Sequence, residues 1–325
     1  MPSWNELLTE FNVTPPQERG GWIQNRQIAA LQEIGRLRGG RNVLFYSSAF
    51  LQKPQVAPMY TQITHEDMNG LMAVIYGMAY DRDLTLILHT PGGVTNAAES
   101  IVAYLRSKFR NIEVIVPTFA MSAGTMISLA ADRIWMGRQS QLGPIDPQFV
   151  MANGALSARA VVDQFERAKK EIVADRATAH VWAPILQAVG PALLQEAQNA
   201  LEYGERMVAE WLEQYMFRGR ETAAEEAARA AHHFNDASMH KSHGRRIGRD
   251  EARTQGVVIE DLEQNQELQD QVLTAYHLAT ITFEQSPATK VLISDSSRVW
   301  LKNWVPPQMP LQVARPISLD LQTVG

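Results

Sequence analysis

The stretch Leu84-Thr85-Leu86-Ile87-Leu88-His89-Thr90-Pro91-Gly92-Gly93 decides the fold of this chain. Its first half is an apolar run with the length of a buried strand, and its second half is a glycine turn. Apolar residues at helical spacing follow the turn, at Ala97, Ala98, Ile101, Val102, Leu105 and Phe109. The stretch therefore predicts a strand, a tight turn and a helix, which is the beginning of a parallel β-α-β unit.

The same order of elements recurs on both sides of this stretch. Before it, the strand-like residues 43–46 precede a helix predicted over residues 64–78. After it come a strand at residues 112–116, a helix at 123–131 and a short strand at 133–136. Strands that alternate with helices across short loops predict the α/β class, with a largely parallel sheet and right-handed crossovers.

The hydrophobic pattern divides the chain into four segments. Residues 1–40 are amphipathic and are predicted to form an N-terminal helical docking segment, while residues 41–156 form the α/β core. Residues 157–290 are mainly helical and belong to the same domain. Residues 291–325 are predicted to be an extended C-terminal tail, because prolines follow Trp304 at positions 306, 307, 310 and 316.

Composition excludes several classes of function. The 325 residues are 45% hydrophobic and 20% charged, which is ordinary for a folded domain with a sizeable core, and the formal charge of −5 favours neither a nucleic-acid partner nor an anionic membrane surface. The absence of cysteine excludes disulfides, thiolate nucleophiles and cysteine metal sites. No signal-peptide pattern and no run of about 18 apolar residues is present, so we expect a cytoplasmic protein without a membrane span.

Two turns carry the candidate chemistry. The glycine turn at Gly92 and Gly93 is followed, one strand later, by Ala120-Met121-Ser122-Ala123-Gly124-Thr125 at the start of the next helix. Turns after consecutive parallel strands meet at the carboxyl edge of the sheet, where such folds hold ligands. Glycine amides facing a serine at a helix start suit acyl transfer, which needs donors for an oxyanion. Each motif alone has a simpler interpretation, as a tight turn and as a helix N-cap.

Together with a third motif, these turns resemble the serine dehydrogenase proteinase family. The third motif is Leu142-Gly143-Pro144-Ile145-Asp146-Pro147-Gln148, and the likeness runs from about residue 41 to about residue 282. This family is a branch of the Clp-protease and signal-peptide-peptidase-A group with the crotonase-like fold, a parallel sheet of repeated β-β-α units. The resemblance implies a serine peptidase in which Ser122 is the nucleophile, Gly93 and Ala123 donate the oxyanion-hole amides, and residues 142–148 shape the cleft edge.

Serine also needs a base to take its proton. The Clp-protease pattern places a histidine where this chain has Gln139-Ser140-Gln141-Leu142-Gly143, so that position is empty. We favour His243, in a loop that resembles a His-x-x-x-Ile segment of the family, although a solvated loop histidine is the simpler interpretation. The alternative bases are Lys169 and Lys170, by analogy with signal-peptide-peptidase-A-like relatives, and Lys241. Lys169 and Lys170 lie in a charged run that is typical of a solvated helix face.

Four further residues are predicted to line the cleft, namely Gly92, His89, Gly143 and Asp146. Asp146 either orients a histidine or caps the turn before Pro147. His89 either faces the cleft or ends its strand in a satisfied hydrogen bond. His240 and His243 have the spacing of a metal-binding pair but no carboxylate in their segment, so no metal site is predicted. No G-x-G-x-x-G or G-x-x-x-x-G-K-[ST] motif is present, and no cofactor is expected.

Three hypotheses about function follow. The first is a serine peptidase that cleaves a protein or peptide substrate through an acyl-enzyme at Ser122. The second is a catalytically silent oligomeric scaffold or peptide-binding member of the same fold. The third is acyl-thioester chemistry of the crotonase type, which shares the oxyanion hole but needs no serine nucleophile. By analogy with relatives that assemble into rings, trimers or tetramers, we expect a homo-oligomer.

Overall fold

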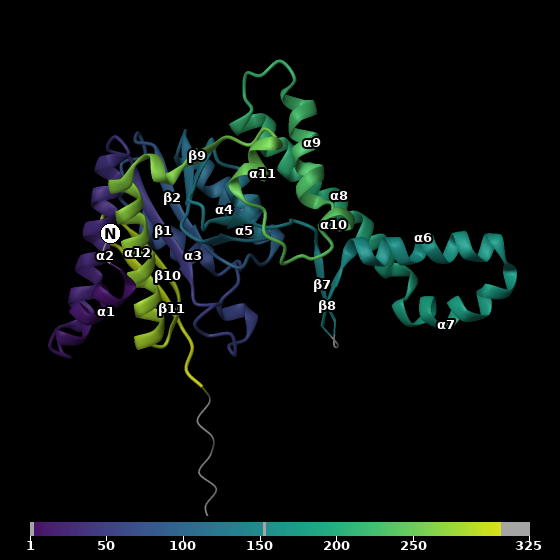
Figure 1. The fold of residues 1–325 in the computed structure, drawn as a ribbon, viewed down its shortest axis with the longest axis horizontal. Coiled ribbons are helices and arrows are strands. Elements are labelled where there is room, and N and C mark those ends of the chain that lie inside the picture. The colour runs from purple at the N-terminus through teal and green to yellow at the C-terminus, as the bar shows by residue number, and fades with distance from the viewer. Residues whose placement is uncertain (1–2, 152–153, 307–325) are drawn as a thin grey trace, which may run out of the picture.

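A seven-stranded sheet forms the centre of the molecule in the computed structural model, which describes residues 3–151 and 154–306 (Figure 1). The strand order is β11-β10-β1-β2-β3-β5-β9. Five strands run parallel, namely β1 (Asn42–Ser48), β2 (Leu84–His89), β3 (Ile112–Val116), β5 (Arg133–Met136) and β9 (Ile259–Asp261). The prediction of an α/β fold with a largely parallel sheet is therefore confirmed.

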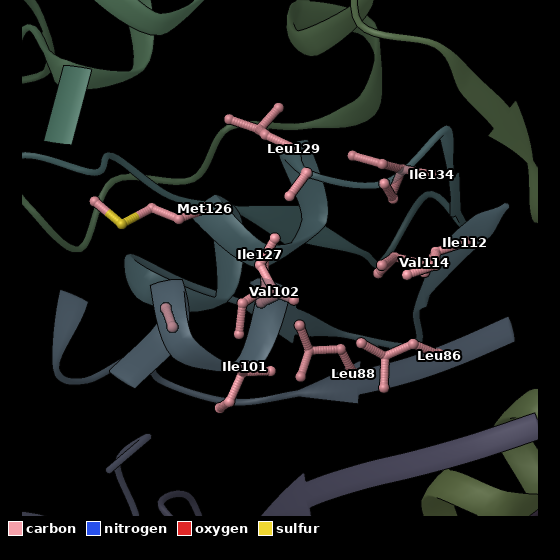
Figure 2. Packing of buried hydrophobic residues seen from close by; sticks show 14 of the residues in the cluster. Leu86, Leu88, Ile101, Val102, Ile112, Val114, Met126, Ile127, Leu129 and Ile134 are labelled. Carbon is pink, nitrogen blue, oxygen red and sulfur yellow. The ribbon is translucent and has the colours of Figure 1, made fainter. Parts of the chain in front are cut away.

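Strand β2 is buried on both faces because helices cover the sheet on both sides. Leu86 and Leu88 point into one core, shared with α4 (Thr95–Lys108) and α5 (Ala123–Leu129), as Figure 2 shows. Ile87 points into the second core, under α2 (Arg19–Leu37) and α12 (Gln266–Gln285). A strand buried on both faces has to be a continuous apolar run, which explains the pattern of residues 84–88.

The remaining helices complete these two layers. Helix α3 (Asp67–Ile75) joins the layer of α4 and α5, and α1 (Trp4–Val13) packs its Leu7 and Phe11 on Leu278 and Ile281 of α12. In the structure, α1 and α2 are thus part of the layer that covers the sheet. Shorter elements are η1 (Pro58–Tyr60), η2 (Arg176–Thr178), η3 (Leu212–Met216), α10 (Ala237–His240), α11 (Arg249–Thr254) and η4 (Leu262–Gln264).

A small second layer of strands follows the carboxyl ends of the main strands. β4 (Phe119–Ala120) pairs in parallel with β6 (Gln141–Leu142), and single bridges add Thr90 beside Ala120 and Ile247 beside Leu142. β3 and β5 are thus each followed by a short strand of this layer, and β2 is followed by the bridge residue Thr90, in keeping with the expected β-β-α repeat. This layer lies where the two predicted turns begin.

The second half of the chain is mainly helical, as predicted. It contains α6 (Ala158–Ala174), α7 (Ala179–Val189), α8 (Pro191–Trp211) and α9 (Ala223–Asn235), and Figure 1 shows α6 and α7 extending away from the sheet. Sequence analysis missed the hairpin of β7 (Gln148–Met151) and β8 (Gly154–Ser157) that precedes α6.

The predicted extended tail at residues 291–325 is wrong for its first part. Residues 288–294 form β10 (Ala288–Ser294), which pairs antiparallel with β1, and β11 (Val299–Asn303) pairs with β10 at the sheet edge. The apolar Val291-Leu292-Ile293 belongs to a buried strand, and the prolines that suggested a tail come only after Trp304. Residues 307–325 lie outside the described part. None of the described helices is both long and apolar enough to cross a membrane.

Candidate active site

The two predicted turns are joined by backbone hydrogen bonds. The amide of Thr90 donates to the carbonyl of Phe119 at 2.9 Å, and the amide of Met121 donates to the carbonyl of Thr90 at 3.1 Å. The Thr90 hydroxyl also accepts from the amide of Gly92 at 3.1 Å, which closes the glycine turn. Residues from two separate β-α units therefore form one continuous wall at the carboxyl edge of the sheet.

Ser122 has a backbone conformation that L-residues rarely adopt. Its φ is 50° and its ψ is −117°, and its hydroxyl makes no capping hydrogen bond to α5. The simpler interpretation of Ser122 as a side-chain N-cap therefore does not apply. A strained, partly exposed serine between a strand and a helix has the geometry of a nucleophile elbow, and such strain costs about 1–3 kcal/mol unless the surroundings impose it.

The glycines are required because the turns approach each other closely. A Cβ on Gly92, whose φ is 97°, would lie 2.6 Å from the Cβ of Ser122. A Cβ on Gly93, whose φ is 153°, would lie 2.3 Å from the carbonyl oxygen of Ile63. In the described residues, the amides of Gly93 and Ala123 donate to no acceptor. Both amides therefore remain available as donors, one directly after Ser122 and one directly after the glycine that packs on it.

A short segment at Ile63 and Thr64, which sequence analysis missed for the site, forms backbone hydrogen bonds with the glycine turn. The amide of Ile63 donates to the carbonyl of Gly92 at 2.7 Å, and the carbonyl of Ile63 accepts from Val94 at 2.9 Å. The next amide, that of Thr64, donates to the buried carboxylate of Asp67 at 2.8 Å. The sequence predicts that the helix begins at residue 64, but α3 begins only at Asp67.

His243 pairs with Asp146, two residues that were predicted independently for the site. The Nδ1 atom of His243 lies 2.8 Å from Oδ1 of Asp146, and Asp146 is 1% exposed. The other carboxylate oxygen accepts from Gln148 at 2.6 Å and from Ser157 at 3.1 Å. A carboxylate only accepts, so His243 Nδ1 carries a proton, and in the neutral ring this leaves Nε2 as the acceptor.

The small sheet brings this pair toward the serine turn. Leu142 of β6 exchanges two 2.9 Å hydrogen bonds with Ile247, which follows the His243 loop. On the same strand end, Gly143 packs so closely on Met121 that a Cβ would lie 2.4 Å from the methionine Cε. No hydrogen bond joins Ser122 to His243 within residues 3–151 and 154–306. In uncomplexed active sites such contacts are often long and tighten only on substrate binding.

The alternative bases are solvent-exposed. Lys169 and Lys170 lie on the exposed face of α6, and Lys241 is an exposed residue with a φ of 63° after α10. A lysine needs burial to lose its proton near neutral pH, and none of the three has it. Of the two candidate classes, the histidine is therefore the better supported by the geometry.

His89 is buried at the end of β2. Its Nδ1 lies 2.8 Å from the hydroxyl of Thr118, and its ring packs against Phe50, Phe119 and Tyr276. This burial lowers the pKa of His89 to about 3, so the ring is neutral. These contacts fit the structural alternative for His89 better than the cleft-lining one.

His240 and His243 do not face a common ligand site. The Nε2 atom of His240 lies 2.6 Å from the carbonyl of His233, and its Nδ1 lies 3.0 Å from Arg245. Across the described ranges, no three histidine, aspartate or glutamate side chains gather to hold a metal ion. A pocket of about 380 Å³ adjoins the His243–Asp146 pair and is also lined by Gln148, Arg159 and Lys241.

Comparison with known proteins gives the family. The model of the ClpP-like SDH-type serine proteinases matches residues 7–187, more than half of the chain. The chain belongs to the ClpP-like SDH-type serine proteinases. This agrees with the resemblance found in the sequence.

Two uncharacterized proteins of Methanocaldococcus jannaschii are each 34% identical to this family member. The alignment with the first covers 66% of this chain and 74% of that protein, and the alignment with the second covers 46% and 50%. Among solved structures, a ClpP1 variant from Listeria monocytogenes is 16% identical with a TM-score of 0.35, covering 65% of this chain and 91% of that one. A variant of the membrane-bound stomatin-specific protease 1510-N is 15% identical with a TM-score of 0.34, covering 76% and 90%.

Proposed function

We propose that this ClpP-like proteinase hydrolyses peptide bonds through an acyl-enzyme on Ser122. The observation that carries the proposal is the strained serine turn with two unpaired amides beside it, those of Gly93 and Ala123. Membership of a serine proteinase family supports it. The predicted partner is accordingly a protein or peptide substrate.

Each residue of the site has a defined role in this reaction. His243 Nε2 takes the proton of the Ser122 hydroxyl as the serine oxygen attacks the carbonyl carbon of the substrate. The amides of Gly93 and Ala123 stabilise the negative charge that develops on the carbonyl oxygen. His243 then gives the proton to the leaving amine, and a water molecule that it activates releases the acyl group. Asp146 keeps the imidazole in the required tautomer and orientation.

A fluorophosphonate probe tests this proposal directly. The folded protein should be labelled at Ser122, and Ser122→Ala should lose both labelling and peptide hydrolysis. His243→Ala should slow labelling strongly, while Lys169→Ala and Lys170→Ala should leave it unchanged because both side chains are exposed on α6. Equal peptide hydrolysis after Ser122→Ala would refute the proposal, and so would thioester cleavage that survives this substitution, which would favour crotonase-type chemistry.

One observation favours a second candidate, a peptide-binding protein without turnover. This is the absence of a hydrogen bond between Ser122 and His243 in the described residues. Such a protein would bind peptides but show no probe labelling, and alteration of His243 would not change its binding. The labelling experiment therefore separates the two candidates.

A further inference from the structure

A buried ion pair between Lys290 and Asp67 lies near the segment that contacts the glycine turn. Nζ of Lys290, in β10, is 2.7 and 3.0 Å from the two carboxylate oxygens of Asp67, and the two side chains are 1% and 0% exposed. The hydroxyl of Tyr46, in β1, donates to the same carboxylate at 3.0 Å. Burial lowers the pKa of Lys290, and it raises the pKa of Tyr46 well above its usual value, with Asp67 adding to the rise. Burying such a pair costs several kcal/mol per ion, and apolar replacement is often neutral or stabilising, so stability alone does not explain it.

The third donor to Asp67 connects this pair to the glycine turn. It is the amide of Thr64, at 2.8 Å. The preceding residue, Ile63, binds the chain on both sides of Gly93, through the Gly92 carbonyl at 2.7 Å and the Val94 amide at 2.9 Å. Asp67 therefore fixes a segment whose neighbouring residue determines where Gly93 lies.

We propose that Asp67 is a positioning residue for the amide of Gly93. Lys290 and Tyr46 anchor its carboxylate to β10 and β1, and Thr64 and Ile63 carry this constraint to the glycine turn. The inference rests on the proposed function, in which the Gly93 amide contacts the oxyanion. Because a misplacement of about 1 Å at a catalytic group costs about 100-fold in rate, loosening this segment should reduce kcat.

Two variants, one with three substitutions and one with two, test the proposal without leaving a buried charge unpaired. The triple variant Tyr46→Phe, Asp67→Leu, Lys290→Met removes the charges and also the acceptor for Thr64. The double variant Asp67→Asn, Lys290→Met removes the charges but keeps an oxygen that accepts from Thr64. We expect the triple variant to lose 10- to 100-fold in kcat with KM nearly unchanged, and the double variant to recover most of that loss.

The chain offers a matched control in the Arg106–Asp132 pair. Arg106 lies 2.8 Å from Asp132, whose carboxylate also accepts from a backbone amide, that of Ile112 at 2.7 Å. This pair lies at the amino ends of β3 and β5, and the two turns lie at the opposite, carboxyl ends of the parallel strands. The double variant Arg106→Met, Asp132→Leu should leave kcat near the wild-type value. Thermal unfolding of every variant checks that the protein is folded.

Backbone hydrogen exchange gives a readout that does not need turnover. The amides of Ile63 and Val94 should exchange at least 10-fold faster in the triple variant than in the Arg106–Asp132 control. Unchanged exchange and kcat in a folded triple variant would overturn the inference, and so would an equal loss in the control. If the wild-type protein shows no probe labelling, the proposed function fails, whereas exchange at Ile63 and Val94 still decides whether Asp67 positions the turn.

Discussion

Substitution of Gly92 by alanine separates backbone strain from damage to the serine turn. The added Cβ would lie 2.6 Å from both the Met121 carbonyl oxygen and the Cβ of Ser122, and 3.0 Å from the Ala123 amide nitrogen. Non-bonded carbon atoms normally stay about 3.5–4.0 Å apart, so one of the two turns must move by about 1 Å. All three contacts belong to the turn that carries Ser122, so either movement changes the position of Ser122 relative to the glycine turn.

The matched control is Gly40→Ala. Gly40 has a similar φ, 81° compared with 97° for Gly92, but a Cβ there would meet no atom within 4 Å. Both variants should lose about 1–2 kcal/mol in the free energy of unfolding, the cost of a left-handed conformation in an L-residue, and Gly92→Ala should lose about 1–3 kcal/mol more because of its clashes. Only Gly92→Ala should also lose about 100-fold in the rate of fluorophosphonate labelling, because its serine is displaced by about 1 Å.

Urea unfolding measures the free energy of unfolding, and a time course of probe labelling measures the labelling rate independently. Equal labelling rates for wild type, Gly40→Ala and Gly92→Ala would refute the argument that contact between the turns sets the place of Ser122. A fall in labelling in both variants would attribute the loss to general destabilisation instead.

Three further predictions follow from the contacts described above. Asp146→Asn should slow probe labelling by a factor on the order of 10⁴, because the Asn amide favours the wrong tautomer of His243; labelling at the wild-type rate would remove Asp146 from the mechanism. The pKa of His89 is about 3 in the folded protein against 6.5 in the unfolded chain, so the unfolded state binds protons first as the pH falls. Its contribution to stability is complete above pH 6.5 and should decline by about 1.4 kcal/mol per pH unit from there toward pH 3. Urea unfolding between pH 7 and 5 should show a shallower decline in His89→Leu, and an identical slope would contradict the burial argument. Sedimentation should show a homo-oligomer, and a species of 36.3 kDa alone would contradict that expectation.

Features that depend on neighbours along the chain were predictable from the sequence. An apolar strand, a glycine turn and a helix start are each encoded within a few residues, so the parallel sheet and the place of both turns followed from residues 84–93 and 120–125. The meeting of the two turns also followed, because consecutive parallel strands end at one edge of the sheet. The strain at Ser122 did not follow, since it depends on the approach of Gly92 from another unit.

Contacts between distant parts of the chain were decided only by the tertiary structure. Asp146 and His243 are 97 positions apart, and the sequence allows Asp146 to orient a histidine or to cap a turn without saying which histidine it meets. Asp67 and Lys290 are 223 positions apart, and neither is predicted for the site. A lysine within an apolar strand gives no sign of its partner, because the partner, Asp67 at the start of α3, is set by how that helix packs on the sheet. By itself, then, the sequence determined the class of sheet and the place of the two turns. The pairing of β10 with β1 determined what holds the glycine turn in place, since only folding brings that lysine to Asp67.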